Sequence, residues 1–195
     1  MIEITNVLFW ISTGLLIPVV VVLLIVFIQS LVMGGSFLGM YLSRMKFQKE
    51  LVLRLHSIKS GEQDIQFLNH IKGNAAFKHA MLEVTGTSNP LFAEKALADF
   101  EVLTNKDLAK SKSISKLGPM LGLMGTLIPM GPALVGLASG DISSMAQNMQ
   151  VAFSTTVVGL FAGALGYVLQ LTKQRWYTSD LSNLEFAYEL RFNQK

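Results

Sequence analysis

The chain has 195 residues, of which 51% are hydrophobic and only 15% are charged, and its mean hydropathy is +0.45. A soluble domain is normally about a quarter charged, so this composition points toward the membrane. The net charge of +3 does not indicate a nucleic-acid partner, because no cluster of basic and aromatic residues accompanies it. The absence of cysteine excludes disulfides and thiolate chemistry.

The first apolar run, residues 7–42, contains no charged residue. It would form about 54 Å of helix, longer than the roughly 30 Å hydrocarbon core of a bilayer. We therefore expect residues 8–33 to cross the membrane, with Trp10 near the outer interface and Tyr41 near the inner one. Pro18 is tolerated in a membrane helix when neighbours satisfy the carbonyl that it frees. No basic leader with a cleavage site is visible, so we expect the helix to be retained.

Residues 44–116 carry most of the charge, including twelve of the sixteen Lys and Arg residues. The first helix is predicted to continue to about residue 60, followed by short helices over residues 62–71 and 75–84. A further helix is predicted to run into the next apolar segment, capped by Ser88 or Asn89 with Pro90 in its first turn. We expect a small helical bundle. The apolar stripe predicted on the last helix consists of Leu91, Ala96, Leu97, Phe100 and Leu103.

The histidines of the chain are His56, His70 and His79. Their spacing does not match the i, i+4 pair of a helical metal site, and no cysteine is available as a ligand. We therefore expect no metal site and no cofactor, and interpret the histidines as solvated or structurally bonded.

Residues 117–138 and 145–171 are two further apolar runs, each long enough to cross a bilayer and joined by a polar turn at residues 139–144. Asp141 is the only charged residue of this hairpin. Small residues four positions apart let membrane helices approach closely. The predicted packing positions are Gly118, Gly122, Gly125, Gly159 and Gly163.

The hairpin also carries hydroxyl side chains at about mid-membrane depth: Thr126 on the first run, and Ser154, Thr155 and Thr156 on the second. A membrane threonine often bonds a carbonyl of its own helix, so a purely structural role is the alternative for each. Three successive hydroxyls point in different directions, and we expect at least one to face a polar interior. Neither run contains a titratable side chain, so an acid for proton transfer would have to come from a partner.

Charge placement predicts the topology. The remaining four Lys and Arg follow the last apolar run, whereas the N-terminal side and the turn carry only Glu3 and Asp141. The positive-inside rule then places the middle segment and the C-terminal tail in the cytoplasm and the N-terminus outside. Trp176 and Tyr177 mark the inner interface. The tail that follows has Leu181, Leu184, Tyr188 and Arg191 at helical spacing, and we expect it to pack on the bundle.

These elements predict an all-α membrane protein, in which three transmembrane helices extend into a small helical cytoplasmic domain. The expected domains are residues 1–43, the outer segment with the first membrane helix, and residues 44–116, the cytoplasmic helical domain. Residues 117–172 form the membrane hairpin, and residues 173–195 form the cytoplasmic tail.

Two motifs of the hairpin match a known family. The stretches P-M-L-G-L-M-G-T-L-I at residues 119–128 and A-F-S-T-T-V-V-G-L at residues 152–160 resemble the paired signatures of the MotA/TolQ/ExbB proton-channel family. Three membrane helices with a cytoplasmic domain between the first two are similar to its TolQ/ExbB branch.

The resemblance implies a homopentamer in the inner membrane, surrounding a dimer of a single-span ExbD/TolR/MotB-like partner whose membrane aspartate carries the ion. The pore-lining threonines of the family correspond to Thr126 and Thr156, with Ser154 and Thr155 beside them. Ion flow would drive rotation of the pentamer and work across the envelope. Whether protons or sodium ions flow, and which process is driven, stays open.

The sequence departs from the family in two places. ExbB-type members carry an acid at the outer start of the third helix, where this chain has Asn148 and Gln150. Asp141 and Asn148 are therefore the candidates for an outer ion-access site. Pro129 and Pro132 in the second membrane helix favour a kink.

Two functions follow from these residues: a subunit of an ion-driven motor or energiser, and a non-conducting scaffold that assembles neighbouring membrane proteins. An intramembrane enzyme is not expected, because a hydroxyl nucleophile needs a base within reach and the membrane runs offer none.

Overall fold

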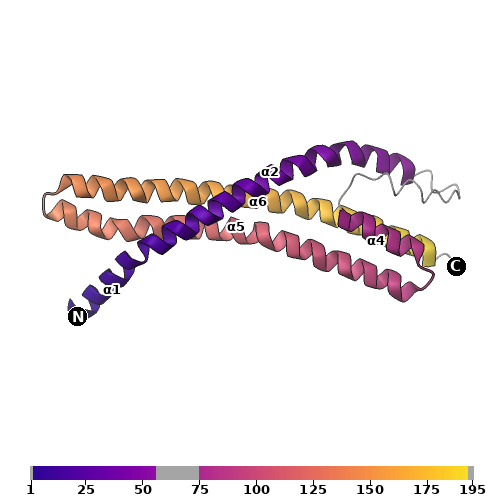
Figure 1. Ribbon diagram of the computed structural model, residues 1–195, viewed down its shortest axis with the longest axis horizontal. Helices are drawn as coiled ribbons and strands as arrows, with labels where there is room; N and C mark the ends of the chain where they lie inside the picture. The colour runs from indigo at the N-terminus through magenta and orange to yellow at the C-terminus, as the bar shows by residue number, and fades with distance from the viewer. Residues whose placement is uncertain (1, 56–74, 193–195) are drawn as a thin grey trace. The chain divides into compact units, whose positions relative to one another are not determined.

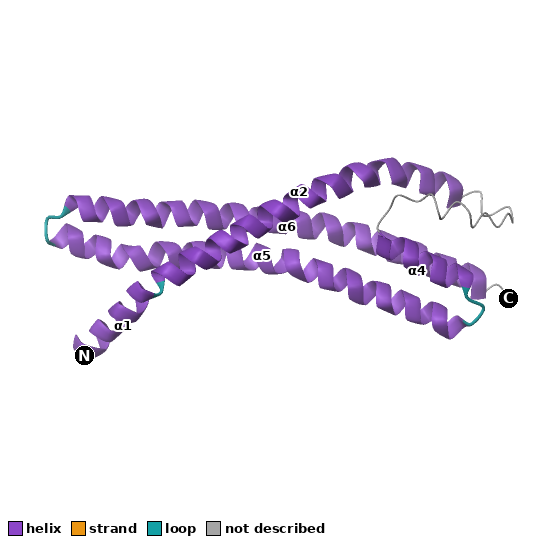
Figure 2. Ribbon diagram, in the orientation of Figure 1, coloured by secondary structure: helices purple, strands orange, loops and turns teal. Residues whose placement is uncertain are grey.

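The computed structural model describes residues 2–55 and 75–192 (Figure 1). These residues form α1 (Ile2–Gly14), α2 (Leu16–Leu55), α4 (Ala75–Gly86), α5 (Pro90–Ala138) and α6 (Ile142–Phe192). Figure 2 shows helices and short connections, and no strand, over this part of the chain. The predicted all-α fold is therefore confirmed. The helix predicted over residues 62–71, together with His56 and His70, lies outside the described residues.

The first apolar run is interrupted between α1 and α2, at Leu15 (Figure 2). Pro18 has no N–H to donate to the carbonyl of Gly14, and its ring crowds that carbonyl. The N–H of Leu15 bonds to Ile11 O at 3.1 Å, and the N–H of Val19 bonds to Leu15 O at 3.1 Å, so hydrogen bonding continues on both sides of the break. The expected membrane segment over residues 8–33 lies within one candidate span, Asn6–Leu42, so Pro18 is accommodated with a local break at Leu15.

The chain packs as two compact units. The first consists of Met1–Gly34 and Lys110–Gln170, and the second of Gly35–Ala109 and Leu171–Lys195. This division follows packing and not the membrane surface, so the domain boundaries predicted at residues 44, 117 and 173 stay a prediction.

In the first unit, α5 and α6 pack antiparallel along a seam of small residues (Figure 1). Gly118 lies against Gly159 and Gly163, whereas Gly136 lies against Asp141 and Met145 at the other end of the seam. The buried seam positions are Gly118, Gly122, Gly125, Pro129, Ala133 and Gly136 on α5, and Ala152, Thr155, Gly159, Ala162, Gly163, Gly166 and Leu169 on α6. Such small side chains let backbones meet directly, which supplies van der Waals contact where lipid removes the hydrophobic driving force.

The turn of the hairpin is closed by a helix C-cap followed at once by an N-cap. Gly140 has a φ of 77°, a left-handed conformation that favours glycine. The N–H of Asp141 bonds to Gly136 O at 2.8 Å and that of Gly140 to Leu137 O at 3.2 Å, the paired bonds of a Schellman motif. Asp141 Oδ1 then accepts from the N–H of Ser144 at 3.0 Å and caps α6.

Three prolines lie inside α5, at Pro119, Pro129 and Pro132, and the helix continues through all of them from Pro90 to Ala138. The helix is continuous at Pro129 and Pro132, and the kink expected there stays a prediction. Because proline has no N–H, each removes the helical donor to the carbonyl four residues before it.

The second unit has an apolar core contributed by α4, α5 and α6. Its main cluster consists of Phe77, Ala80, Met81, Phe100 and Leu184, and a second cluster contains Val84, Ala93 and Ala96. Leu184 is fully buried, so the tail residues of α6 pack on the bundle as expected. Asn89, and not Ser88, caps α5, because Asn89 Oδ1 accepts from the N–H of Leu91 at 3.0 Å.

The stripe predicted on the first part of α5 is partly wrong. Leu91 and Leu103 are 72% and 55% exposed, whereas the buried positions are Ala93, Ala96, Phe100 and Thr104. Leu91 lies two residues before Ala93, and two residues turn a helix through about 200°. It therefore faces away from the core that Ala93 enters.

Arg44 and Asp180 form a buried ion pair between α2 and α6, in the second unit and outside the membrane runs. An Arg44 guanidinium nitrogen also donates to Trp176 O at 3.2 Å, and the guanidinium lies 5.1 Å from the centre of the Trp176 ring. Phe37 stacks on the same indole at 5.2 Å. Among the described residues, Arg44 Nε and Asp180 Oδ2 are buried without a hydrogen-bond partner. Burial raises the pKa of Asp180, and the opposing attraction of Arg44 does not offset it.

We expect Asp180→Leu or Arg44→Met alone to destabilise the second unit by about 3–5 kcal/mol, because each leaves one buried charge without its partner. The double variant Arg44→Met/Asp180→Leu is expected to recover most of that loss. Because the pKa of Asp180 is higher in the folded than in the unfolded protein, protonation of Asp180 favours the folded state. This contribution to stability is present at acidic pH and is lost as the pH rises through the folded-state pKa. Unfolding midpoints of the single and double variants test the effect of breaking the ion pair. Midpoints of the unmodified protein, measured from acidic to neutral pH, test the pH dependence. A double variant as unstable as the sum of the two singles would contradict the pairing.

Candidate functional site

Thr155 lies inside the seam of the hairpin. It is buried, and a Cβ atom placed on Gly125 would lie 2.6 Å from Thr155 Oγ1. Its hydroxyl bonds to Val151 O at 3.0 Å and Ala152 O at 2.9 Å, both in its own helix. Thr155 therefore contacts α5 and is 6% exposed, so its side chain is enclosed by the hairpin.

Thr126 and Thr156 lie on one side of the hairpin. Each follows a buried seam residue by one position, Gly125 on α5 and Thr155 on α6. One residue turns a helix through about 100°. Because the two helices run antiparallel, these equal rotations lead to the same side of the pair. Gly122 and Gly125 contact the 155–156 region of α6, so the two threonines also lie at similar depth.

The helix α2 covers the other side of the hairpin. Val26 packs in one cluster with Ile114 and Ala162, and Leu121 joins it. The rings of Phe27 and Phe161 are 6.1 Å apart. Leu121 and Phe161 each precede a buried residue of α5 or α6 by one position, so they lie on the side opposite Thr126 and Thr156. These contacts of α2 therefore lie on the side of the hairpin opposite Thr126 and Thr156.

The two threonine hydroxyls keep acceptor capacity toward this open side. Thr126 Oγ1 donates to Leu123 O at 2.7 Å, and Thr156 Oγ1 donates to Ala152 O at 3.0 Å. A hydroxyl has one proton and two acceptor lone pairs, so each oxygen can still accept a hydrogen bond. The surface around them is apolar and exposed, with Leu123, Met130, Phe153 and Leu160 one turn before or after the threonines. Each hydroxyl is thus an isolated acceptor on an apolar face.

The other predicted site residues lie apart from this pair. Ser154 is exposed, and its hydroxyl bonds to Gln150 O at 2.8 Å. Asp141 caps α6, and Asn148 Nδ2 donates to Ser144 O at 2.9 Å. Asp141 and Asn148 thus have local structural partners at the turn of the hairpin, and their role in ion access stays a prediction.

The described residues contain no group of three or more His, Asp or Glu side chains that would hold a metal ion. His79 lies on the exposed surface of α4, with Nδ1 3.5 Å from Glu83 Oε1. This contact is the structural bonding expected for a surface histidine.

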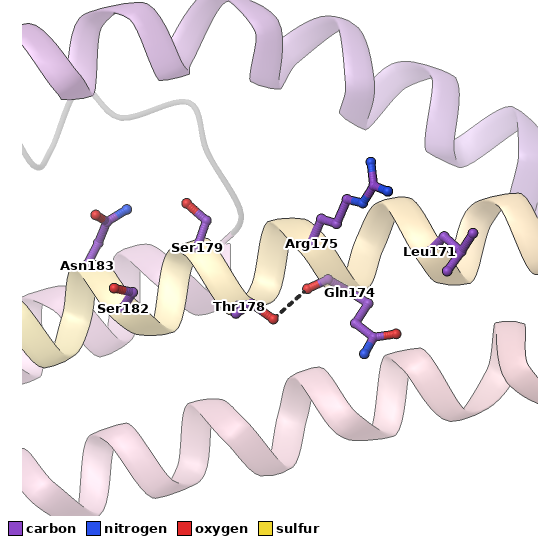
Figure 3. Close-up of a pocket in the computed structure, with 7 residues that line it drawn as sticks. All are labelled: Leu171, Gln174, Arg175, Thr178, Ser179, Ser182 and Asn183. Carbon is purple, nitrogen blue, oxygen red and sulfur yellow. Dashed lines mark hydrogen bonds between the residues drawn. The ribbon is translucent and has the colours of Figure 1, made fainter.

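A shallow depression of about 630 Å³ follows one polar face of α6 in the second unit (Figure 3). Its lining consists of Leu171, Gln174, Arg175, Thr178, Ser179, Ser182 and Asn183. Thr178 Oγ1 donates to Gln174 O at 2.9 Å within the helix. Among the described lining residues there is one cation and no carboxylate or imidazole, so these residues offer no acid–base pair.

One polar contact across the seam is not indicated by any motif of the sequence. Ser115 Oγ lies 3.4 Å from Gln170 Oε1, and also donates to Lys112 O at 3.0 Å. The signal in the sequence is weak, because Ser115 precedes the apolar run and Gln170 is a lone amide at the end of the other run.

Among the described residues, three helices are long and apolar enough to cross a membrane: Asn6–Leu42, Pro90–Ala138 and Ile142–Phe192. Three such helices, two of them packed as a hairpin along a seam of small residues, define a multi-pass membrane protein. The family described as MotA/TolQ/ExbB proton channels matches residues 69–185, more than half of the chain, and the chain belongs to that family. Comparison with curated proteins and with solved structures found no match.

Proposed function

We propose that this chain is the ring-forming subunit of a proton-driven motor or energiser of the cell inner membrane, related to the TolQ/ExbB branch. The observation that carries the proposal is the placement of Thr126 and Thr156 at similar depth on the side of the hairpin that α2 leaves uncovered. In a ring of copies, that side would face the axis, where two hydroxyl oxygens per subunit accept hydrogen bonds from a passing ion carrier.

The chain has no intramembrane acid on the hairpin apart from Asp141 at the turn. A proton carrier is therefore supplied by a partner: a dimer of single-span chains, each with an aspartate in its membrane helix, enclosed by five copies of this subunit. When protonated, such a carboxyl group donates to a threonine oxygen, and when ionised it is stabilised poorly by the apolar face. Alternation between these states couples proton passage to movement of the ring around the dimer.

In this role the chain is a conducting subunit and not an enzyme. Its N-terminus would lie outside and its C-terminus in the cytoplasm. Support for the orientation comes from the positive charge of residues 44–116 and of the tail. The alternative is a scaffold whose glycine seam assembles membrane neighbours without conduction.

Native mass spectrometry of the detergent-purified chain, alone and co-expressed with a single-span chain that bears a membrane aspartate, tests the architecture. We expect five copies alone, and five copies with two partner chains after co-expression. A monomer, a dimer or a ring of another size that ignores the partner would contradict the proposal and favour the scaffold.

A further inference from the structure

We propose that Ser115 and Gln170 form the cytoplasmic outlet of the ion path. They would be a second polar site on this path, on the cytoplasmic side of Thr126 and Thr156. This inference rests on the proposed function. The two side chains meet across the seam, with Ser115 Oγ 3.4 Å from Gln170 Oε1. Both side chains are half-buried, so they are held by their neighbours and still reach the surface of the hairpin.

The pair lies on the same side of the hairpin as the threonines. Ser115 precedes Thr126 by eleven residues, and Gln170 follows Thr156 by fourteen. At about 100° per residue, these separations return each position to within roughly 40° of its threonine. The contacts that α2 makes with Leu121 and Phe161 belong to the other side.

The pair also lies at the inner end of the apolar runs. At 1.5 Å of rise per residue, Ser115 is about 16 Å, and Gln170 about 21 Å, from the level of the threonines. Lys116 is the next residue after Ser115, and Lys173 follows Gln170 by three positions. Positively charged residues of this kind mark the cytoplasmic boundary of a membrane helix.

The seam itself offers no route between the two levels. Cβ atoms placed on Gly118 and Gly159 would lie 2.6 Å and 2.5 Å from the facing backbone carbonyl oxygens, and the ring of Pro119 covers Gly163. An ion must therefore travel along the open face. Between the threonines and the outlet, the polar side chain on the hairpin runs is that of Tyr167, which is 56% exposed and follows Thr156 by eleven residues.

The chemistry of the pair suits the transfer of a proton to water. A serine hydroxyl both donates and accepts, and an amide presents donors and an acceptor, so either side chain can bond a hydronium ion or the water that takes its proton. Pro119 removes the helical N–H that would otherwise bond the carbonyl of Ser115. That carbonyl lies 3.4 Å from the position of a Cβ on Gly163, so it faces the seam.

The test uses the full complex with its single-span partner in proteoliposomes, with proton flux followed by an internal pH-sensitive dye. We expect the double variant Ser115→Ala/Gln170→Leu to lower the flux per complex at least tenfold, with unchanged subunit numbers in native mass spectrometry and an unchanged unfolding midpoint. Ser115→Thr keeps the hydroxyl and is expected to conduct as the unmodified protein does. Gln29→Leu removes an exposed amide from α2, and serves as the matched control.

The outcomes separate this inference from the proposed function. If the unmodified complex conducts and the double variant conducts equally, the outlet is wrong and the proposed function stands. If the double variant loses stability while its flux per intact complex is unchanged, the pair is only a clamp between α5 and α6, and the inference is overturned. If the unmodified complex shows no partner-dependent flux, the proposed function fails, and the outlet fails with it.

Discussion

Replacement of Thr126 or Thr156 by valine is expected to lower partner-dependent proton flux by about tenfold to hundredfold without loss of assembly. Valine keeps the shape of threonine and removes the hydroxyl oxygen that accepts a hydrogen bond on the open face. Without this acceptor, the protonated carboxyl of the partner is left without a hydrogen bond on an apolar face, which costs about 1–3 kcal/mol and corresponds to this order of rate change. The measurement is the initial rate of internal acidification in proteoliposomes, divided by the number of intact complexes.

A matched control is Thr13→Val. Thr13 lies on α1, and its hydroxyl donates to Phe9 O at 2.9 Å, so it bonds a carbonyl of its own helix just as Thr126 and Thr156 do. Its flux is expected to equal that of the unmodified protein. Thr155→Val provides a second comparison, since Thr155 is buried in the seam and its loss is expected to affect stability more than flux. Normal flux in both Thr126→Val and Thr156→Val would remove the basis of the ion path and leave the scaffold as the better explanation.

Substitution of Gly159 by alanine is expected to separate α5 from α6. The added Cβ would lie 2.5 Å from Gly118 O and 2.7 Å from Gly122 Cα, and neither backbone atom can move aside by a side-chain rotation. Overpacking of this kind costs about 1–3 kcal/mol. We expect a lower unfolding midpoint in detergent, and a larger loss for Gly159→Leu, together with loss of the purified oligomer.

Gly34→Ala is the control for this prediction, because Gly34 is a helical glycine of the same compact unit with nothing within 4 Å of the added Cβ. Removing a glycine from a helix interior stabilises by about 0.5–1 kcal/mol, so the two variants are expected to shift the midpoint in opposite directions. Equal shifts of the same sign would show that the seam does not limit the stability of the hairpin.

Much of the fold was predictable because the apolar runs are long and nearly free of charge. Such runs allow few structures other than membrane helices, since backbone groups in lipid must be satisfied within the helix. The difference arises where local rotation about a helix axis decides the outcome. The apolar stripe that includes Leu91 follows helical spacing only approximately, and Leu91 is exposed.

Contacts between distant charged residues were not predictable. Arg44 and Asp180 lie more than a hundred positions apart, and nothing in the spacing of either indicates its partner. Ser115 and Gln170 present the same difficulty, because the register between α5 and α6 depends on the length of the turn and on the fit of the glycine seam.

The amino-acid sequence by itself determined three membrane runs, a glycine-rich hairpin, the hydroxyl positions and the family motifs, because these depend on composition and on spacing along one helix. Only the tertiary structure decided which hydroxyls share a face. Spacing specifies rotation about a helix axis relative to other residues of that helix, whereas the direction of the partner is set by packing. With the seam located by Gly125 and Thr155, Thr126 and Thr156 fall together on the side that α2 does not cover.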